Sequence, residues 1–417
     1  MRNVFDVLEE RGFVRQCTDE QALRTLLEKE KVTSYIGYDP TAKSLTVGHL
    51  LPIMAQTHMQ RAGHRVIVIM GGGTALIGDP SGKTEMRRMI SASQIEQNAQ
   101  RLKGQFAQIL AFRSWWQPST WETGALMINN ARWLTKLNHI RFLRDIGVHF
   151  SVNRMLSSAA YEGRMEKGLS FIEFGYMPLQ AYDFLVLFRK YGCKLQMGGD
   201  DQWGNILAGV DLIRRVEGET VHALTFPLIE TATGQKMGKT ATGAVWLDPE
   251  LTSPYEFFQY WVNVDDRDVK RFLALFTFLP MGEVQRLGSL SGAKIRQAKE
   301  VLAYEVTKIV HGEREAEKAK KATRAIFGGE GEIAGIPTLE LTREEIDRGI
   351  PLVNLFEEVG LTSSRGAARR LVEQEGAYLN DKRVKSIEQI LSLDDFTNGE
   401  AFLRRGKKKV HRLKLAH

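Results

Sequence analysis

The first 245 residues or so alternate short apolar segments with longer amphipathic ones, and this alternation constrains the fold more than any other feature. HRVIVIMGGG (64–73) is continuously apolar and ends in glycines, which is typical of a central strand in a parallel sheet. CKLQMGGDDQWGN (193–205) reads as a short strand, a polar loop and the start of a helix. The pattern predicts repeated βαβ units and an α/β fold with a doubly wound, Rossmann-like parallel sheet. Ligands of such sheets bind beyond the carboxyl ends of the strands, where these polar loops fall.

The pattern changes near residue 250, which predicts further domains. Ser253 and Glu256 form a capping box with Pro254 at the first helical position, and helical patterning then dominates to about residue 327. The glycine-rich stretch GGEGEIAGIP (328–337) reads as a linker. The predicted division is an α/β domain over 1–245, an α-helical domain over 246–327, a linker over 328–349 and a small basic α+β domain over 350–417.

The positive charge is concentrated at the carboxyl-terminal end. The net charge is +7 at pH 7, and residues 361–417 alone hold 13 Lys and Arg against 7 Asp and Glu. This asymmetry indicates a polyanionic partner, and nucleic acid is the obvious one. The alternative is a basic surface that is merely solvated.

The remaining composition points to a reduced compartment. Cys17 and Cys193 lie far apart in sequence and form neither a disulfide framework nor a metal-ligand cluster. The N-terminal segment lacks a secretory apolar core, and nothing approaches the ~18 uninterrupted apolar residues of a membrane span. We therefore expect a cytoplasmic protein without membrane association.

The stretch GDPSGKT (78–84) raises the question of a phosphate-binding loop. A P-loop needs a glycine, four residues and then Gly-Lys-Ser/Thr, but the position five before Gly82 is Ile77. The dinucleotide fingerprint also fails, because it requires glycine where Leu76 stands. If this stretch handles phosphates, it uses neither standard device.

A second polar segment, YDPTAKSLTVGHL (38–50), leads from a turn into a helix. The N–H groups and the dipole of a helix N-terminus favour phosphate, and Gly48 lets a ligand approach the backbone. The alternative is an ordinary helix cap with a surface histidine. The polar residues concerned are Asp39, Thr41, Thr46 and His49.

The loop TGQKMGKT (233–240) carries Lys236 and Lys239 between glycines. Two lysines on a mobile loop can fold over a polyphosphate and neutralise charge that develops in a transition state. The alternative is an ordinary solvent-exposed loop.

Two more segments carry polar side chains that a ligand could contact. In FGYMPLQAYDFLVLF (174–188), Tyr176, Gln180 and Asp183 form one stripe of an otherwise apolar helix and therefore need partners, either a ligand or each other. In GGDDQWGN (198–205), the acidic and amide groups at a strand end suit the amine or the ribose hydroxyls of a ligand.

Together and in this order, the segments resemble a known family. YDPTAKSLTVGHL resembles the His-Ile-Gly-His signature, and KMGKT (236–240) the Lys-Met-Ser-Lys-Ser signature, of the class I aminoacyl-tRNA synthetases. GGGTALIGDPSGKT (71–84), the polar stripe and GGDDQWGN match the bacterial tyrosyl-tRNA synthetases, and the resemblance covers essentially the whole chain. It implies a tyrosine–tRNA ligase that forms tyrosyl-adenylate and pyrophosphate from L-tyrosine and ATP. Tyrosine would then pass to the 3′-terminal adenosine of tRNA(Tyr).

The resemblance also implies residue roles. Tyr35 and Asp183 would bind the phenol hydroxyl of tyrosine, so that phenylalanine leaves buried polar groups unpaired. This enzyme class is itself the known example of phenylalanine being rejected by about 10⁵-fold without editing. No editing domain is therefore expected. The other tyrosine contacts would be Asp79, Tyr176, Gln180 and Gln202. The contacts to ATP, pyrophosphate or the adenylate would be Asp39, Thr41, Thr46, Gly48, His49, Lys83, Arg87, Asp201, Lys236 and Lys239.

ATP would enter together with Mg²⁺, and no protein-bound metal or organic cofactor is expected. The chain departs from the family pattern where Thr46 replaces the first signature histidine, since a threonine donates a hydrogen bond but carries no charge. Gly238 and Thr240 replace the two serines of the second signature, while both lysines remain.

The carboxyl-terminal domain resembles a small RNA-binding module found in a ribosomal small-subunit protein, and the helical domain would contact the anticodon arm. The segment from about 110 to 165, which includes FLRDIGVHFSVNRML (142–156), resembles the connective region through which the family forms symmetric homodimers. The basic residues expected to hold tRNA phosphates are Arg365, Arg369, Arg404, Arg405, Lys407, Lys408 and Lys409.

Two other functions compete with this interpretation. A nucleotide-dependent enzyme that acts on RNA, such as a kinase, is disfavoured by the missed P-loop spacing and by the polar stripe. A non-catalytic, synthetase-like RNA-binding protein should have lost at least one of four residues, and all four are present: Lys236, Lys239, His49 and Asp183.

Overall fold

The computed structural model divides the chain into two compact units, and each unit is discontinuous in sequence. One unit consists of Met1–Met237 with Lys270–Ser289, and the other of Gly238–Val269 with Leu290–His417. The four-part division predicted from the sequence stays a prediction. The residues that the structure describes are 2–81, 89–114, 122–158, 161, 164–235, 237–240, 243–328, 336–380, 382–406 and 409–416.

The first unit is built on an α/β sheet, as the alternating pattern predicts. Among the described residues, six strands lie in the order β1-β6-β5-β2-β3-β4, and all neighbours are parallel except the β1–β6 pair. From β2 the chain moves outward through β3 to β4, and it then returns to the other side of β2 with β5 and β6. The topological switch therefore lies between β2 and β5. The strands are β1 (Gln16–Cys17), β2 (Thr33–Tyr38), β3 (Arg65–Met70), β4 (Leu126–Asn129), β5 (Cys193–Gly199) and β6 (His222–Phe226).

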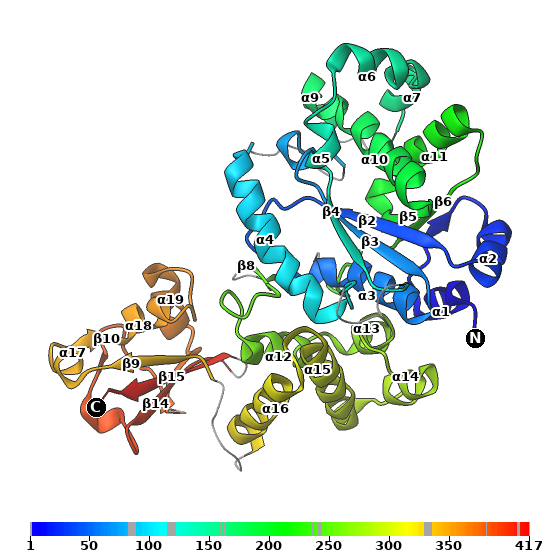
Figure 1. Cartoon of the computed structure of the whole chain (residues 1–417). Helices are drawn as coiled ribbons and strands as arrows, with labels where there is room; N and C mark the ends of the chain where they lie inside the picture. Colours follow the sequence, from blue (N-terminus) through cyan, green and yellow to red (C-terminus); the bar gives the residue numbers. More distant parts are fainter. Residues whose placement is uncertain are drawn as a thin grey trace. The chain divides into compact units, whose positions relative to one another are not determined.

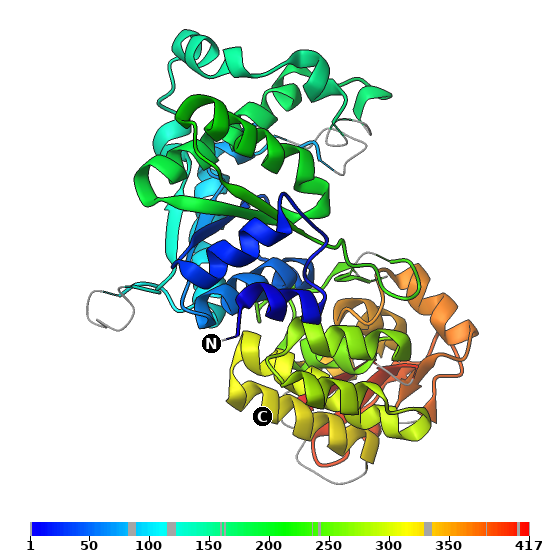
Figure 2. The same cartoon turned by 90° about the vertical axis from the view of Figure 1, so that its right-hand side faces the viewer.

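Helices cover both faces of this sheet because alternate strand residues point to opposite sides. Tyr35 and Ile67 face α10 and α11 and share a buried core with Phe184. Tyr38 points the other way, where its hydroxyl donates to Gln56 of α3 at 3.0 Å. Figures 1 and 2 show the α10–α11 pair (green) and the N-terminal helices (blue) on opposite sides of the strands. The helices are α1 (Val4–Arg11), α2 (Glu20–Lys29), α3 (Val47–Arg61), α4 (Ala92–Ile109), α5 (Ala131–Leu134), α6 (His139–Asp145), α7 (Val152–Leu156), α9 (Phe171–Phe174), α10 (Tyr176–Tyr191) and α11 (Trp203–Glu217).

The segment Lys270–Ser289 belongs to the first unit although it lies far along the chain. It contains most of α13 (Val269–Phe276) and all of α14 (Met281–Gly288). The buried guanidinium of Arg11 donates to the carbonyl oxygens of Ala274 and Thr277, both at 2.8 Å. These carbonyl groups at the end of α13 would otherwise lack partners, so Arg11 fixes the segment against α1.

The second unit begins with a helical layer. Ser253 and Glu256 form the predicted capping box at the start of α12 (Pro254–Val262), with the Ser253 hydroxyl 2.9 Å from Glu256 Oε2. This prediction is confirmed because a capping box depends only on residues three apart. α12 packs with α15 (Ile295–His311) and α16 (Glu313–Gly328).

The rest of the second unit is a small α+β structure. Its main sheet has the order β12-β11-β14-β15-β9. β15, the last strand of the chain, pairs in parallel with β9. β9 falls inside the range predicted as linker, so that part of the range belongs to this sheet. The elements are β9 (Thr338–Leu341), α17 (Arg343–Asp347), α18 (Leu352–Glu358), α19 (Arg365–Glu373), β11 (Ala377–Leu379), β12 (Lys382–Arg383), β14 (Glu400–Arg405) and β15 (Lys409–Leu415).

Candidate functional site

Polar side chains of the first unit gather at the carboxyl ends of its parallel strands. Asp39 directly follows β2, Asn130 follows β4 and Asp201 follows β5, while β3 is followed by Gly71, which has no side chain. Parallel strands end at the same edge of a sheet, and β2 and β5 flank the switch point, where a doubly wound sheet has its ligand crevice.

Asp183 and Tyr35 form a deeply buried part of this cluster. Asp183 of α10 is only 3 % exposed, and it accepts hydrogen bonds from Asn130 Nδ2 at 2.8 Å and from Trp133 Nε1 at 2.7 Å. Burial raises the pKa of Asp183 to about 7, although these two donors act in the opposite direction. The hydroxyl of Tyr35 is buried without a hydrogen-bond partner in the part of the chain that the structure describes. This pair is suited to a ligand hydroxyl, which could donate to the carboxylate and accept from the phenol.

A second group of hydrogen bonds surrounds Asp39. Thr74 Oγ1 donates to Asp39 Oδ1 at 2.7 Å, and the hydroxyl of Tyr176 donates to Asp39 Oδ2 at 3.1 Å. Burial, and then the neighbouring carboxylate of Asp39, raises the pKa of Tyr176 well above its usual value, so the phenol stays neutral. A Cβ atom on Gly71 would lie 1.9 Å from Asp39 Oδ1. The glycine after β3 is therefore required for the close packing of this site.

Asp79 anchors a third group together with the amides of α10 and α11. Gln202 Nε2 donates to Asp79 Oδ2 at 2.8 Å, and the backbone N–H of Ser81 donates to Asp79 Oδ1 at 2.9 Å. Asn205 Nδ2 lies 3.2 Å from Gln180 Oε1 and 3.0 Å from Ser81 Oγ. The group presents a carboxylate and amide oxygens, which are the acceptors that an ammonium group needs.

The N-terminus of α3 carries the residues of the first signature. The backbone N–H of Thr46 donates to His49 Nδ1 at 3.0 Å, which leaves Nε2 of His49 to carry the ring proton. Gly48 and His49 are exposed, and Thr41 lies on the exposed turn that follows Asp39. Threonine at position 46 thus serves as the helix N-cap.

The three groups bring together residues that the sequence had placed in separate motifs. The structure also adds contacts from residues that were not among the predicted site residues: Thr74, Ser81 and Asn205 lie inside the quoted motifs, whereas Asn130 and Trp133 lie outside them. Asn205 could have been found from its place in GGDDQWGN, and Asn130 from its position directly after β4, had that strand been recognised. Trp133 had no such signal.

Asp201 lies at the end of β5, with its Oδ1 2.6 Å from the position that a Cβ atom on Gly199 would occupy.

Several predicted residues lie wholly or partly outside the described part of the chain. Of Lys239 and Lys409 only the backbone is described. The residues outside the description are Lys83, Arg87, Lys236, Lys407 and Lys408.

The predicted basic residues that the structure describes in the second unit lie on α19 and at the end of β14. Arg405 Nη1 donates to the carbonyl oxygen of Leu361 at 3.0 Å, which ties the end of β14 to the turn before α19. Arg365 opens α19 and pairs with Glu357 at 3.0 Å, while Arg369 lies exposed one turn further along. Arg404 lies beside Arg405 on β14, where it pairs with Tyr378 of β11.

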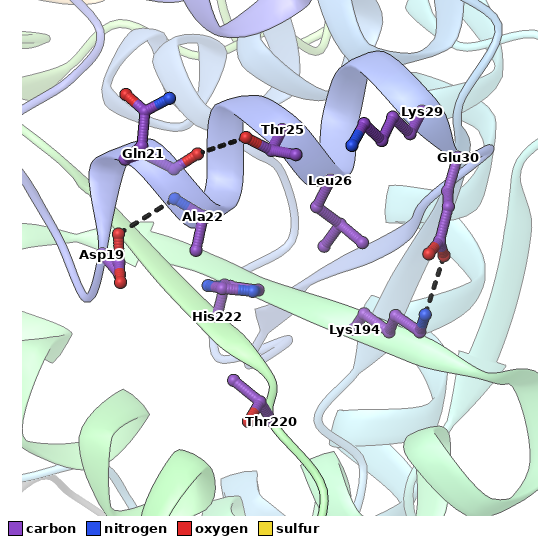
Figure 3. Close-up of a pocket in the computed structure, with 10 residues that line it drawn as sticks. All are labelled: Asp19, Gln21, Ala22, Thr25, Leu26, Lys29, Glu30, Lys194, Thr220 and His222. Carbon is purple, nitrogen blue, oxygen red and sulfur yellow. Dashed lines mark hydrogen bonds and ion pairs between the residues drawn. The ribbon is translucent and has the colours of Figure 1, made fainter.

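An open pocket at the other end of the sheet is a separate feature. It lies at the amino ends of β5 and β6, under α2, and it includes none of the residues above (Figure 3). Some of its polar side chains are paired with the protein itself: Lys194 Nζ lies 2.7 Å from Glu30 Oε2, and Asp19 accepts from the N–H of Ala22 at 2.9 Å. The ligand crevice expected for this fold is at the opposite strand ends.

The described residues contain no group of three or more His, Cys, Asp or Glu side chains able to hold a metal ion. No described helix is both long enough and apolar enough to cross a membrane.

Comparison with known proteins gives consistent matches over the whole chain. Residues 27–328 match the family model for class I tRNA synthetases (W and Y), and residues 330–413 match that for the tyrosine–tRNA ligase SYY-like C-terminal domain. The chain is 54% identical over 411 residues to the tyrosine–tRNA ligase of Caldanaerobacter subterraneus subsp. tengcongensis, with 99% of each chain covered. It is 53% identical over 414 residues to the tyrosine–tRNA ligase of Clostridium botulinum (strain 657), again with 99% of each chain covered.

Solved structures agree with these matches. A C-terminally truncated mitochondrial tyrosyl-tRNA synthetase from Aspergillus nidulans superimposes with a TM-score of 0.69 at 30% identity, covering 78% of this chain and 95% of that one. A tryptophanyl-tRNA synthetase from Encephalitozoon cuniculi shares the fold, with a TM-score of 0.54 at 12% identity, covering 76% of this chain and 87% of that one.

Proposed function

The chain belongs to the class I tRNA synthetases, among the tyrosine–tRNA ligases, and we propose that the side chains at the β2–β5 switch form the site in which it activates tyrosine with ATP. The observation that carries this proposal is the buried pair of Tyr35 and Asp183. One member has an unpartnered hydroxyl among the described residues, and the other is a carboxylate held by two donors. This is the chemistry that a phenol hydroxyl needs, and phenylalanine cannot satisfy it.

The rest of the tyrosine molecule would be held by the other two groups. Asp79, Tyr176 and Gln180 surround the place for the α-amino group, and Gln202 keeps Asp79 oriented through its 2.8 Å hydrogen bond. A protonated amine would add charge-assisted hydrogen bonds to Asp79. The substrate carboxylate would then point away from Asp183, towards the N-terminus of α3.

The substrate carboxylate is itself a nucleophile, so the first step needs neither a general base nor an enzyme nucleophile. It attacks the α-phosphorus of ATP, the bond from that phosphorus to the bridging oxygen breaks, and pyrophosphate leaves. The chain contributes positioning and electrostatic stabilisation of charge on the phosphoryl oxygens. ATP is bound as its Mg²⁺ complex, which is a substrate. The residues proposed for ATP, pyrophosphate and adenylate are Asp39, Thr41, Thr46, Gly48, His49, Lys83, Arg87, Asp201, Lys236 and Lys239.

In the second step a ribose hydroxyl of the 3′-terminal adenosine of tRNA(Tyr) attacks the carbonyl carbon of the adenylate, and AMP leaves. We propose that the second unit holds this tRNA by its phosphates. The support is that α19 carries Arg365 and Arg369, and that the hydrogen bond from Arg405 to Leu361 ties the end of β14 to the turn before this helix. Arg404, Lys407, Lys408 and Lys409 extend the same segment of sequence.

We also propose a symmetric homodimer formed through α6, α7 and α9. Large apolar side chains are exposed on these helices, which lie together at one end of the first unit (Figure 1). Phe171 of α9 is 80 % exposed and Ile140 of α6 is 71 % exposed, and Val148, in the turn between α6 and α7, is also 71 % exposed. An apolar patch of this kind is typical of a protein–protein interface. Leu143, Val152 and Met165 are further exposed apolar residues of the same segment.

A cytoplasmic location is the simplest one for these partners. Both cysteines are free, and burial raises the pKa of the Cys193 thiol to about 12, so that it stays protonated. Structural thiols of this kind are typical of a reducing compartment.

The test is ATP–pyrophosphate exchange with purified protein and Mg²⁺, without tRNA, comparing tyrosine, phenylalanine and tryptophan. We expect exchange with tyrosine alone. Absence of exchange with all three amino acids, from folded protein that still binds tRNA, would instead support the non-catalytic RNA-binding alternative.

A further inference from the structure

A buried ion pair lies just before the helix that carries the tyrosine-binding side chains. Arg164 Nε lies 2.8 Å from Glu173 Oε1, and Arg164 Nη2 lies 3.2 Å from Glu173 Oε2. The two side chains are only 7 % and 2 % exposed. Burial alone would raise the pKa of Glu173, but the hydrogen bonds from Arg164 and Ser170 outweigh it and lower the pKa, so the carboxylate is ionised.

Further hydrogen bonds of the pair connect the backbone near Gly168 with Ser170 at the start of α9. Arg164 Nη2 also donates to the carbonyl oxygen of Gly168 at 2.9 Å. Glu173 Oε2 accepts from the hydroxyl of Ser170 at 2.7 Å, which forms the capping box of α9. Another hydrogen bond holds the end of α9: the hydroxyl of the fully buried Tyr161 donates to the carbonyl oxygen of Phe174 at 2.8 Å.

The position of α10 depends on these turns. α9 ends at Phe174, only Gly175 separates it from α10, and Gly175 provides no side-chain cap. Tyr176 is then the first residue of α10, so any rotation of α9 moves its hydroxyl relative to Asp39. Gln180 and Asp183 follow on the same helix.

Stability alone is a weak reason for such a pair. Replacing a buried ion pair with well-packed uncharged residues is often neutral or stabilising, because desolvation of both charges offsets their attraction. The bidentate contact of a guanidinium with a carboxylate does, however, define distance and angle more strictly than apolar packing.

We propose that Arg164 and Glu173 are positioning residues for tyrosine binding, because they set where α10 begins and hence where Tyr176 meets the substrate. The inference rests on the proposed tyrosine site, and it adds two residues that touch neither substrate nor the reacting atoms. The pair acts on the tyrosine pocket and leaves the ATP contacts at α3 unaffected.

The test compares Arg164→Met/Glu173→Gln with the parent protein in tyrosine-dependent ATP–pyrophosphate exchange. The double variant removes both charges, while glutamine at position 173 still completes the capping box with Ser170. We expect KM for tyrosine to rise on the order of tenfold, with KM for ATP and kcat within about twofold of the parent. Arg164→Lys keeps the charge without the planar fork, and it should raise KM for tyrosine in the same way.

The matched control is Arg189→Met at the other end of α10. Arg189 also pairs with a glutamate, Glu217, at 2.6 Å, but its side chain is 48 % exposed. It should leave both KM values unchanged. A folded double variant with the parent's KM for tyrosine would overturn the inference, and so would a parallel rise of both KM values.

Subunit assembly is checked separately, because Met165 and Phe171 are exposed beside the pair. Sedimentation of the variants at assay concentration should match that of the parent. If the rise in KM disappears at high protein concentration, the pair serves assembly, and the positioning role is wrong. Failure of the parent itself to exchange with tyrosine would refute the proposed function, which is a different result.

Discussion

Replacing Tyr35 with phenylalanine should weaken tyrosine binding without weakening the fold. The Tyr35 side chain is 1 % exposed, and its hydroxyl has no hydrogen-bond partner among the described residues. Burial raises its pKa well above the usual value, so the group is a neutral phenol. In the free protein, this hydroxyl therefore carries a desolvation cost without a compensating hydrogen bond.

The size of the effect follows from the kind of hydrogen bond that is lost. A neutral hydrogen bond contributes about 0.5–1.5 kcal/mol net, which corresponds to a rise of about 2- to 12-fold in KM for tyrosine. The competing substrate phenylalanine makes no hydrogen bond with the Tyr35 hydroxyl, so its KM should not rise in the variant. The preference for tyrosine over phenylalanine as substrate should therefore fall by at least this factor. The free energy of unfolding should stay the same or increase by up to about 2 kcal/mol.

Tyr38 on the same strand provides the control. Its hydroxyl is also buried, but it donates to Gln56 Oε1 at 3.0 Å. Tyr38→Phe leaves that buried oxygen without its donor and should reduce the free energy of unfolding by about 1–3 kcal/mol, with little change in KM for tyrosine. Urea unfolding and ATP–pyrophosphate exchange measure both quantities for each variant. If Tyr35→Phe is destabilised as much as Tyr38→Phe, the Tyr35 hydroxyl has a partner in the free protein, and the reasoning fails.

Four other predictions follow from particular groups. Burial raises the pKa of Asp183 from 3.8 to about 7, so its contribution to the free energy of unfolding is present below about pH 4 and is lost as the pH rises to about 7. KM for tyrosine should increase as the pH falls below 7, because the carboxylate becomes protonated, and exchange assays from pH 6 to 8 will check this. Burial and the neighbouring Arg11 and Arg61 lower the pKa of His58 to about 3, so its contribution to stability is present above pH 6.5 and is lost as the pH falls. The free energies of unfolding at pH 5 and pH 7 should therefore differ less in His58→Phe than in the parent protein, by up to about 1.4 kcal/mol per pH unit. Thr46→His should mainly change KM for ATP, and a change confined to KM for tyrosine would show that residue 46 is not beside the phosphates. Phe171→Glu should shift the protein from dimer to monomer in sedimentation, whereas an unchanged sedimentation coefficient would exclude the α6–α9 surface as the interface.

The sequence by itself determined the features that depend on neighbouring residues. Alternating apolar and amphipathic segments predict the parallel sheet, and the capping box of Ser253 and Glu256 occurs where it was expected. The order of the motifs was sufficient for the family, which the comparisons confirm over 99% of the chain. These signals are local or cumulative, so they survive without knowledge of the fold.

Tertiary structure decided which residues meet. Asp183 is held by Asn130 and Trp133, which lie about 50 positions away in sequence and reach it only because β4 lies beside β3 at the edge of the sheet. Arg11 determines that the end of α13 packs on the first unit, although α13 follows the predicted domain boundary by more than twenty residues. Such contacts depend on strand order and on burial, which result from packing of the whole chain and which no short pattern encodes.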